Sequence, residues 1–133
     1  MSGPVVYLST WRIKPGRFEE YQRFHAALVA AVEANEPEVT AFLSFANAAG
    51  TELTNVHVYA DQAVLDRHMQ VIGEQFGLLP GDLTSAMDAL EPIRVLVFGT
   101  PAGAAAEMDR AMADSGVPFE AMPRFLDGFA RRT

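Results

Sequence analysis

Three polar side chains that could support acid–base or hydrogen-bond chemistry alternate along one short stretch, at Asn55, His57 and Tyr59. Successive side chains of a β-strand point to opposite faces, so a strand over residues 52–60 would place all three on one face. His57 is the group that could accept a proton near neutral pH, since an unperturbed histidine has a pKa of about 6.5. We therefore predict His57 as a general base and Asn55 as a second catalytic residue.

Structural roles compete with these catalytic ones. An inward histidine in an apolar sheet can be a packing residue, and Asn55 and Tyr59 could satisfy polar groups at the wall of a barrel. His25 and His68 fall on the apolar stripes of two predicted helices, and we interpret them mainly as packing or interface residues, with His68 the less favoured catalytic candidate. Neither has a second ligand at the i, i+4 spacing of a helix-borne metal site, so no metal is expected.

The first strand is expected to add aromatic side chains to the same cavity. Residues 4–13 are rich in β-branched and aromatic types and are followed by a Lys-Pro-Gly turn. Tyr7, Ser9 and Trp11 share one parity of this strand and are predicted, with Tyr59, to bind substrate. The aliphatic parity of the 52–60 strand suits packing against helices, so the polar parity is predicted to face a cavity between two sheets.

The elements that must position these residues follow from periodicity. Apolar residues at helical spacing begin at Phe18, and Asp61 can cap a second helix. The expected elements are a strand at 4–13, a helix from 18 to about 35–37, strands at 39–47 and 52–60, a helix from 62, a helical segment at 82–90 and a strand at 92–99. The order is β-α-β-β-α-β, which is typical of a ferredoxin-like α+β fold with an antiparallel sheet.

The last part of the chain lies outside that plan. We assign residues 1–103 to the ferredoxin-like domain and residues 104–133 to a C-terminal helical extension. The three phenylalanines of the extension, at 119, 125 and 129, are too apolar for a free linker. The extension is therefore expected to pack on the body or on a partner subunit.

Composition limits the functions that this chain could have. The net charge of −7 opposes binding to nucleic acid or to an anionic membrane, and the absence of cysteine excludes disulfides and thiolate chemistry. Dinucleotide-binding and phosphate-binding glycine loops are missing, so no cofactor is expected. A cytoplasmic location is expected by default, because no targeting or membrane-spanning pattern occurs.

The first strand also predicts self-association. Val5, Tyr7 and Trp11 are apolar on one parity, and Val6 and Leu8 are apolar on the other. Two helices can cover only one face of a four-stranded sheet, so the second face needs another layer. A second copy of the chain is expected to supply it and to form a homodimer, although the extension could instead fold over that face.

The sequence resembles the antibiotic biosynthesis monooxygenase family of dimeric α/β barrels. The matching segments are WRIKPGRFEEY (11–21), Glu36-Pro37-Glu38, NVHVYADQAVLDRH (55–68) and, more weakly, TPAG (100–103). Members of that family oxidise polycyclic aromatic phenols or quinols with molecular oxygen and without flavin, haem or metal. Asn55 and Tyr59 stand where the family has an asparagine and a tryptophan on the third strand.

The resemblance implies a cofactor-independent monooxygenase that acts on a small, hydrophobic aromatic ligand. A deprotonated fused-ring phenol can itself give an electron to oxygen, so the protein needs a dry pocket, stacking groups and one base or hydrogen-bond donor. The same pocket could serve a non-oxidative isomerase or cyclase, or a binding protein without catalysis.

Overall fold

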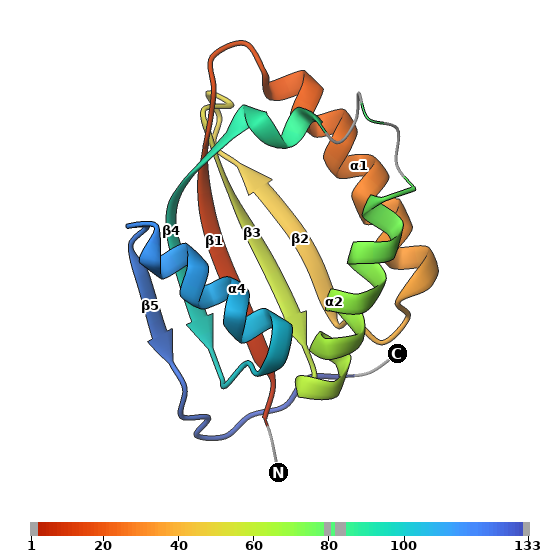
Figure 1. Cartoon of the computed structure of the whole chain (residues 1–133), viewed down its shortest axis with the longest axis vertical. Helices are drawn as coiled ribbons and strands as arrows, with labels where there is room; N and C mark the ends of the chain where they lie inside the picture. Colours follow the sequence, from red (N-terminus) through yellow and green to blue (C-terminus); the bar gives the residue numbers. More distant parts are fainter. Residues whose placement is uncertain (1–2, 79–80, 82–84, 132–133) are drawn as a thin grey trace.

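The computed structural model describes residues 3–78, 81 and 85–131. One mixed sheet carries helices on one face (Figure 1). Its elements in chain order are β1 (Val5–Ile13), α1 (Phe18–Asn35), β2 (Ala41–Ala46), β3 (Glu52–Tyr59), α2 (Gln62–Phe76), the 3-10 helix η1 (Ser85–Ala89), β4 (Leu90–Phe98), α4 (Gly103–Asp114) and β5 (Phe119–Met122).

The strands lie in the order β2-β3-β1-β4-β5. Neighbouring strands are antiparallel, except that β5 runs parallel to β4. The β-α-β-β-α-β plan is thus present, and the α+β ferredoxin-like class predicted from the sequence is confirmed. The parallel fifth strand is an addition that the sequence pattern did not predict.

Local sequence features explain how the elements begin and turn. Gly16, in the turn before α1, has a φ of 77°, a left-handed conformation that glycine adopts without steric cost. The Asp61 side chain accepts a hydrogen bond from the Val64 amide at 3.0 Å and so caps α2, as predicted. Of the predicted helical segment at 82–90, residues 82–84 lie outside the described residues, and η1 forms the next turn.

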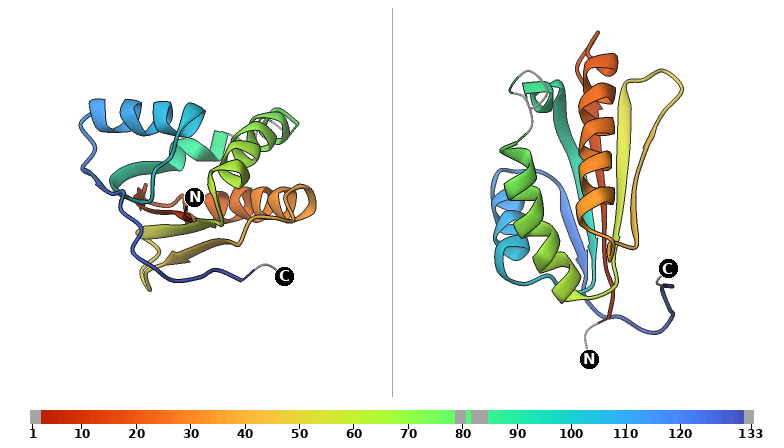
Figure 2. Two further views of the ribbon diagram at one scale, coloured as in Figure 1. Left: turned by 90° about the horizontal axis from the view of Figure 1, so that it is seen from below. Right: turned by 90° about the vertical axis from the view of Figure 1, so that its right-hand side faces the viewer.

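All of the helices described lie on the same side of the sheet (Figure 2). The strand register sets which side chains face them: Tyr7 is opposite His57, Ser9 is opposite Asn55, and Val5 is opposite Tyr59. Val5, Tyr59, Val64, Leu65 and Ala105 form one buried cluster, and a second one contains Ile13, Tyr21, Phe24 and Leu53. The odd-numbered parity of β1 and β3 is therefore the parity that packs against the helices.

The C-terminal extension joins the body at two places. Ala105 on α4 is buried against the core of the sheet and α2. The β5 strand is anchored to β4 by bonds from the Val95 amide to the Pro118 carbonyl and from the Gly99 amide to the Met122 carbonyl. Beyond β5 the chain passes the start of β1, where Phe125 packs on Gly3 (Figure 1). The extension is thus half helix and half extended chain, rather than wholly helical.

Among the helices in the described ranges, none has the length and apolar character that crossing a membrane requires.

Candidate functional site

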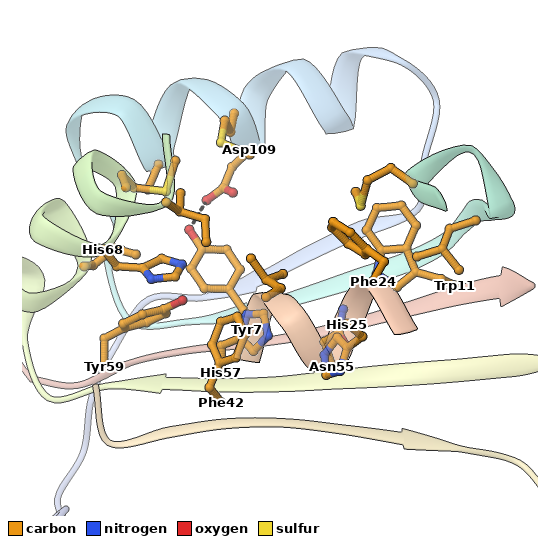
Figure 3. Close-up of a pocket in the computed structure, with 18 of the residues that line it drawn as sticks. Tyr7, Trp11, Phe24, His25, Phe42, Asn55, His57, Tyr59, His68 and Asp109 are labelled. Carbon is orange, nitrogen blue, oxygen red and sulfur yellow. Dashed lines mark hydrogen bonds between the residues drawn. The ribbon is translucent and has the colours of Figure 1, made fainter. Parts of the chain in front are cut away.

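A cavity of about 360 Å³ lies between the sheet and the helices α1, α2 and α4. Its walls are mainly aromatic and aliphatic, with a few polar side chains pointing inward (Figure 3). A mostly apolar pocket with a few convergent polar groups is the usual form of a small-molecule site. This volume lies within the common range for such sites.

Most of the residues predicted from the sequence meet in this pocket. Its lining includes the catalytic candidates Asn55 and His57, the predicted binding residues Tyr7, Trp11 and Tyr59, and the less favoured candidate His68. Ser9 does not line the cavity. Its hydroxyl instead accepts a hydrogen bond from the Trp11 indole nitrogen at 3.0 Å, which fixes the orientation of that ring.

The location of the site corrects one sequence-based prediction. The polar parity of β3 was expected to face a cavity between two sheets, but Asn55, His57 and Tyr59 face the helices of the same chain. The aliphatic parity, with Val56 and Val58, lies on the open face. Polar side chains lie on the helix-facing side of β3 because α1 and α2 themselves present aromatic and imidazole groups to this pocket.

His57 forms part of a stacked aromatic wall. Its ring lies 3.9 Å from the Phe42 ring at an interplanar angle of 8°, and the His25 ring lies 6.5 Å from Phe42, almost parallel to it at 7°. Burial, together with the nearby His68 and His25, lowers the pKa of His57 to about 3. His57 is therefore neutral at pH 7, and the premise that it titrates near neutral pH is wrong.

Several buried polar atoms of the pocket have no hydrogen-bond partner. Among the described residues these atoms include His25 Nε2, Asn55 Oδ1 and His57 Nε2. The other end of the Asn55 amide is held by a hydrogen bond to Tyr21, and burial raises the pKa of that tyrosine to about 12. An unsatisfied buried polar atom costs about 1–3 kcal/mol, so these atoms favour a ligand that offers them hydrogen bonds.

A histidine–carboxylate pair lies at another part of the wall. His68 Nδ1 is 2.7 Å from Glu36 Oε1, and the two side chains are 8% and 2% exposed. Burial raises the pKa of Glu36, and the neighbouring His68 opposes that rise. Glu36 follows the last turn of α1, and no sequence pattern pairs it with a residue of α2.

A second acidic group comes from the C-terminal extension. The Tyr7 hydroxyl donates a hydrogen bond to Asp109 Oδ2 at 2.8 Å. Burial raises the pKa of both groups, and for Asp109 the bond from Tyr7 works in the opposite direction. Asp109 was not predicted from the sequence, although it lies four residues after the buried Ala105 and therefore on the inward face of the predicted helix.

No group of three or more His, Asp or Glu side chains is placed to hold a metal ion within the part of the chain that the structure describes.

Comparison with known proteins gives a fold but no sequence family. No protein-family description and no curated protein matches this sequence. Among solved structures, MupZ from Pseudomonas fluorescens superposes with a TM-score of 0.65 at 18% identity, covering 96% of this chain and 91% of that one. Because so much of this chain is covered, the likeness to MupZ extends into the C-terminal extension.

Other solved structures of this fold carry names that refer to oxygenation. A protein from Caulobacter crescentus, described as an antibiotic biosynthesis monooxygenase, has a TM-score of 0.54 at 16% identity and covers 72% of this chain and 88% of its own. SnoaB, a cofactor-independent oxygenase from Streptomyces nogalater, has a TM-score of 0.52 at 16% identity, with coverage of 77% and 98%. The chain therefore has the fold of the antibiotic biosynthesis monooxygenases.

Proposed function

We propose that this chain is a cofactor-independent monooxygenase that oxidises a polycyclic aromatic phenol or quinol in the pocket between the sheet and the helices. The observation that carries the proposal is the pocket itself. It combines a stacked wall, formed by Phe42 and His57, with unpaired polar atoms on Asn55 and His57. The likeness in fold to proteins named as monooxygenases supports the same class of reaction.

The chemistry requires no external reductant. In a fused-ring substrate with a hydroxyl group conjugated to a CH₂ group, removal of a proton gives an electron-rich anion that can reduce oxygen. The CH₂ carbon then becomes a carbonyl carbon: one oxygen atom enters the product, and the other leaves as water with the two hydrogens. The protein has to bind the rings, exclude water and hold the anion.

The pocket residues divide between these tasks. Phe42, Trp11 and Tyr59 offer aromatic surfaces for the rings, and aromatic contacts of this kind contribute about 0.5–1.5 kcal/mol each beyond burial. Asn55 and His57 offer polar atoms to the ring oxygens. Because His57 is neutral, its part in this proposal is to stack and to hydrogen-bond rather than to take a proton.

Oxygen uptake with anthrone as the probe tests the proposal. The purified protein, without added cofactor or metal, should consume oxygen with saturation kinetics, and ¹⁸O₂ should place one labelled atom in the quinone product. Asn55→Leu should lower kcat/KM by at least about tenfold, since it removes a polar contact and preserves side-chain volume. Val56→Thr, on the same strand but on the opposite face, is the matched control and should retain the parent rate. Saturable anthrone binding with no oxygen uptake would exclude oxygenation.

A non-oxidative isomerase or cyclase is the second candidate. Two acid–base pairs at the pocket wall, Tyr7 with Asp109 and His68 with Glu36, favour it, because proton transfer between positions of a substrate needs both an acid and a base. Conversion of a candidate substrate under nitrogen at the same rate as in air would identify this class.

A further inference from the structure

The paired His68 and Glu36 side chains have the arrangement of an oriented general base. The Nδ1 atom of His68 lies 2.7 Å from Glu36 Oε1, so Nε2 is the ring nitrogen that remains available to a ligand. The His68 ring lines the pocket, near Tyr7 and Tyr59 (Figure 3). A carboxylate on one imidazole nitrogen fixes the tautomer and stabilises the imidazolium that forms when the other nitrogen takes a proton.

The rest of the pocket disfavours isolated charge. Burial lowers the pKa of His57 to about 3 and raises the pKa of Tyr59 above its ordinary value. A phenolate formed alone in these surroundings would be costly. A proton acceptor that becomes positive beside a carboxylate avoids that cost, because the phenolate then has a cation next to it. Glu36 provides such a carboxylate at His68, whereas among the described residues no carboxylate forms a hydrogen bond with His57.

We propose that His68 is the proton acceptor of this pocket and that Glu36 is its positioning residue, an assignment that rests on the function proposed above. The O–H bond of a bound phenol breaks, its proton goes to His68 Nε2, and its electron pair stays on the phenolate oxygen. The acidic hydroxyl of the substrate therefore lies at the His68 end of the cavity, and the rings extend along the Phe42 wall towards Trp11.

Other titratable groups surround the pair, and the test has to separate their effects. They are Tyr7 on β1, His25 on α1, His57 and Tyr59 on β3, Arg67 on α2 and Asp109 on α4. A change in pH can act on any of these groups. The assignment is therefore tested by locating the proton on His68 itself and by matched variants.

The first experiment locates the proton without a ligand. The chain has three histidines, so ¹⁵N-histidine labelling gives three imidazole spin systems, which single His→Asn variants assign. In its neutral form, the His68 ring should carry its proton on Nδ1 and leave Nε2 unprotonated. The alternative is a neutral Glu36 acid that donates to Nδ1, with the ring proton on Nε2. Because burial raises the pKa of Glu36, this alternative is physically accessible, and observing it would overturn the proposal.

The second experiment uses 2-naphthol, whose ionised form absorbs at longer wavelength than its neutral form. Difference spectra of the parent protein should show bound naphtholate at a pH where the free probe is protonated. His68→Asn keeps an amide N–H for Glu36 but removes Nε2, and it should lower the ionised fraction by at least about tenfold. Gln70→Asn, which changes an exposed residue of the same helix outside the pocket, is the matched control and should keep the naphtholate band.

Glu36→Gln provides a second test that keeps an oxygen acceptor for His68 Nδ1 and removes only the charge. It should also reduce the naphtholate band, and it decides the question if His68→Asn does not fold. Bound neutral naphthol in the parent, or full ionisation in both variants, would overturn the assignment. A naphtholate band with 2-naphthol, together with no oxygen uptake with anthrone, would keep His68 as the base and exclude oxygenation. If His68→Asn consumed oxygen with anthrone and kept the pH profile of the parent, the oxygenase function would stand and His68 would be excluded as the base.

Discussion

The imidazole of His57 lies stacked on Phe42 inside an apolar cavity, where burial lowers its pKa to about 3. The sequence identified His57 as a pocket residue, because its position between Asn55 and Tyr59 set its parity. The sequence pattern did not predict the surroundings that lower this pKa, because they depend on Phe42 from another strand and on helices distant in sequence. The same reason explains why Glu36 and Asp109 were missed, since each is joined to its partner only by the tertiary fold.

The buried neutral state of His57 predicts a loss of stability in acid. Its folded pKa is below the unfolded value of 6.5, so the unfolded state binds more protons between pH 6.5 and 3, and the free energy of unfolding falls as pH falls through that window. We expect this loss to be about 3 kcal/mol at pH 4. Denaturant unfolding at pH 7 and pH 4 measures it. His57→Phe preserves an aromatic partner for Phe42 and should reduce the loss; an identical loss in both proteins would contradict the assignment.

The bond between Tyr7 and Asp109 predicts a pH-dependent effect of Tyr7→Phe. Burial raises the pKa of Asp109 and the Tyr7 hydroxyl lowers it, so removal of the hydroxyl leaves the ionised carboxylate less well solvated. The variant should lose about 1–2 kcal/mol of unfolding free energy at pH 7. The deficit should shrink as pH falls and Asp109 becomes protonated. Urea unfolding at pH 7 and pH 4 provides the comparison, and a deficit that grows in acid would contradict this account.

At the scale of elements, periodicity predicted the strands and helices of the first domain closely. The expected strand at 52–60 is β3 at Glu52–Tyr59, and the expected helix from 18 is α1 at Phe18–Asn35. The face of the sheet was assigned wrongly, because alternation shows which residues share a side but not which side the helices cover. The β5 strand was also missed, since four residues that contain Glu120 do not show a clear strand pattern.

The two halves of the extension are predicted to differ in their contribution to stability. A chain that ends at residue 122 keeps β5, whereas a chain that ends at residue 115 keeps α4 and leaves the edge of β4 without its partner. Exposed edge strands promote aggregation, so the shorter chain should be less stable and less soluble. Thermal unfolding with light scattering compares the two. Equal melting temperatures would show that β5 does not stabilise the sheet.

At the scale of the whole molecule, one broad surface is not covered by helices. The open face of the sheet carries the aliphatic and aromatic side chains that alternate with the pocket residues, and Leu43 and Phe45 on β2 remain 47% and 62% exposed. Large exposed apolar patches mark interaction surfaces. This observation supports the homodimer expected from the sequence, with two sheets facing each other and a separate pocket in each chain.

A charge introduced on that face tests the predicted dimer. Light scattering of the parent should give about twice the 14.5 kDa of one chain. Leu43→Glu places a charge on the open face and should shift the population towards monomer. Leu78→Glu changes a leucine that is 76% exposed beyond α2 and should leave the mass unchanged. A parent protein that remains monomeric at micromolar concentration would remove the dimer from this account.

The candidate site lies inside one chain, between the sheet and its helices. A crystal structure of the protein with 2-naphthol tests it most directly. The account predicts density for the probe against the Phe42 and His57 rings, with its oxygen near His68. Density on the open face, against Leu8 and Val56, would contradict the account and return the site to a cavity between two sheets.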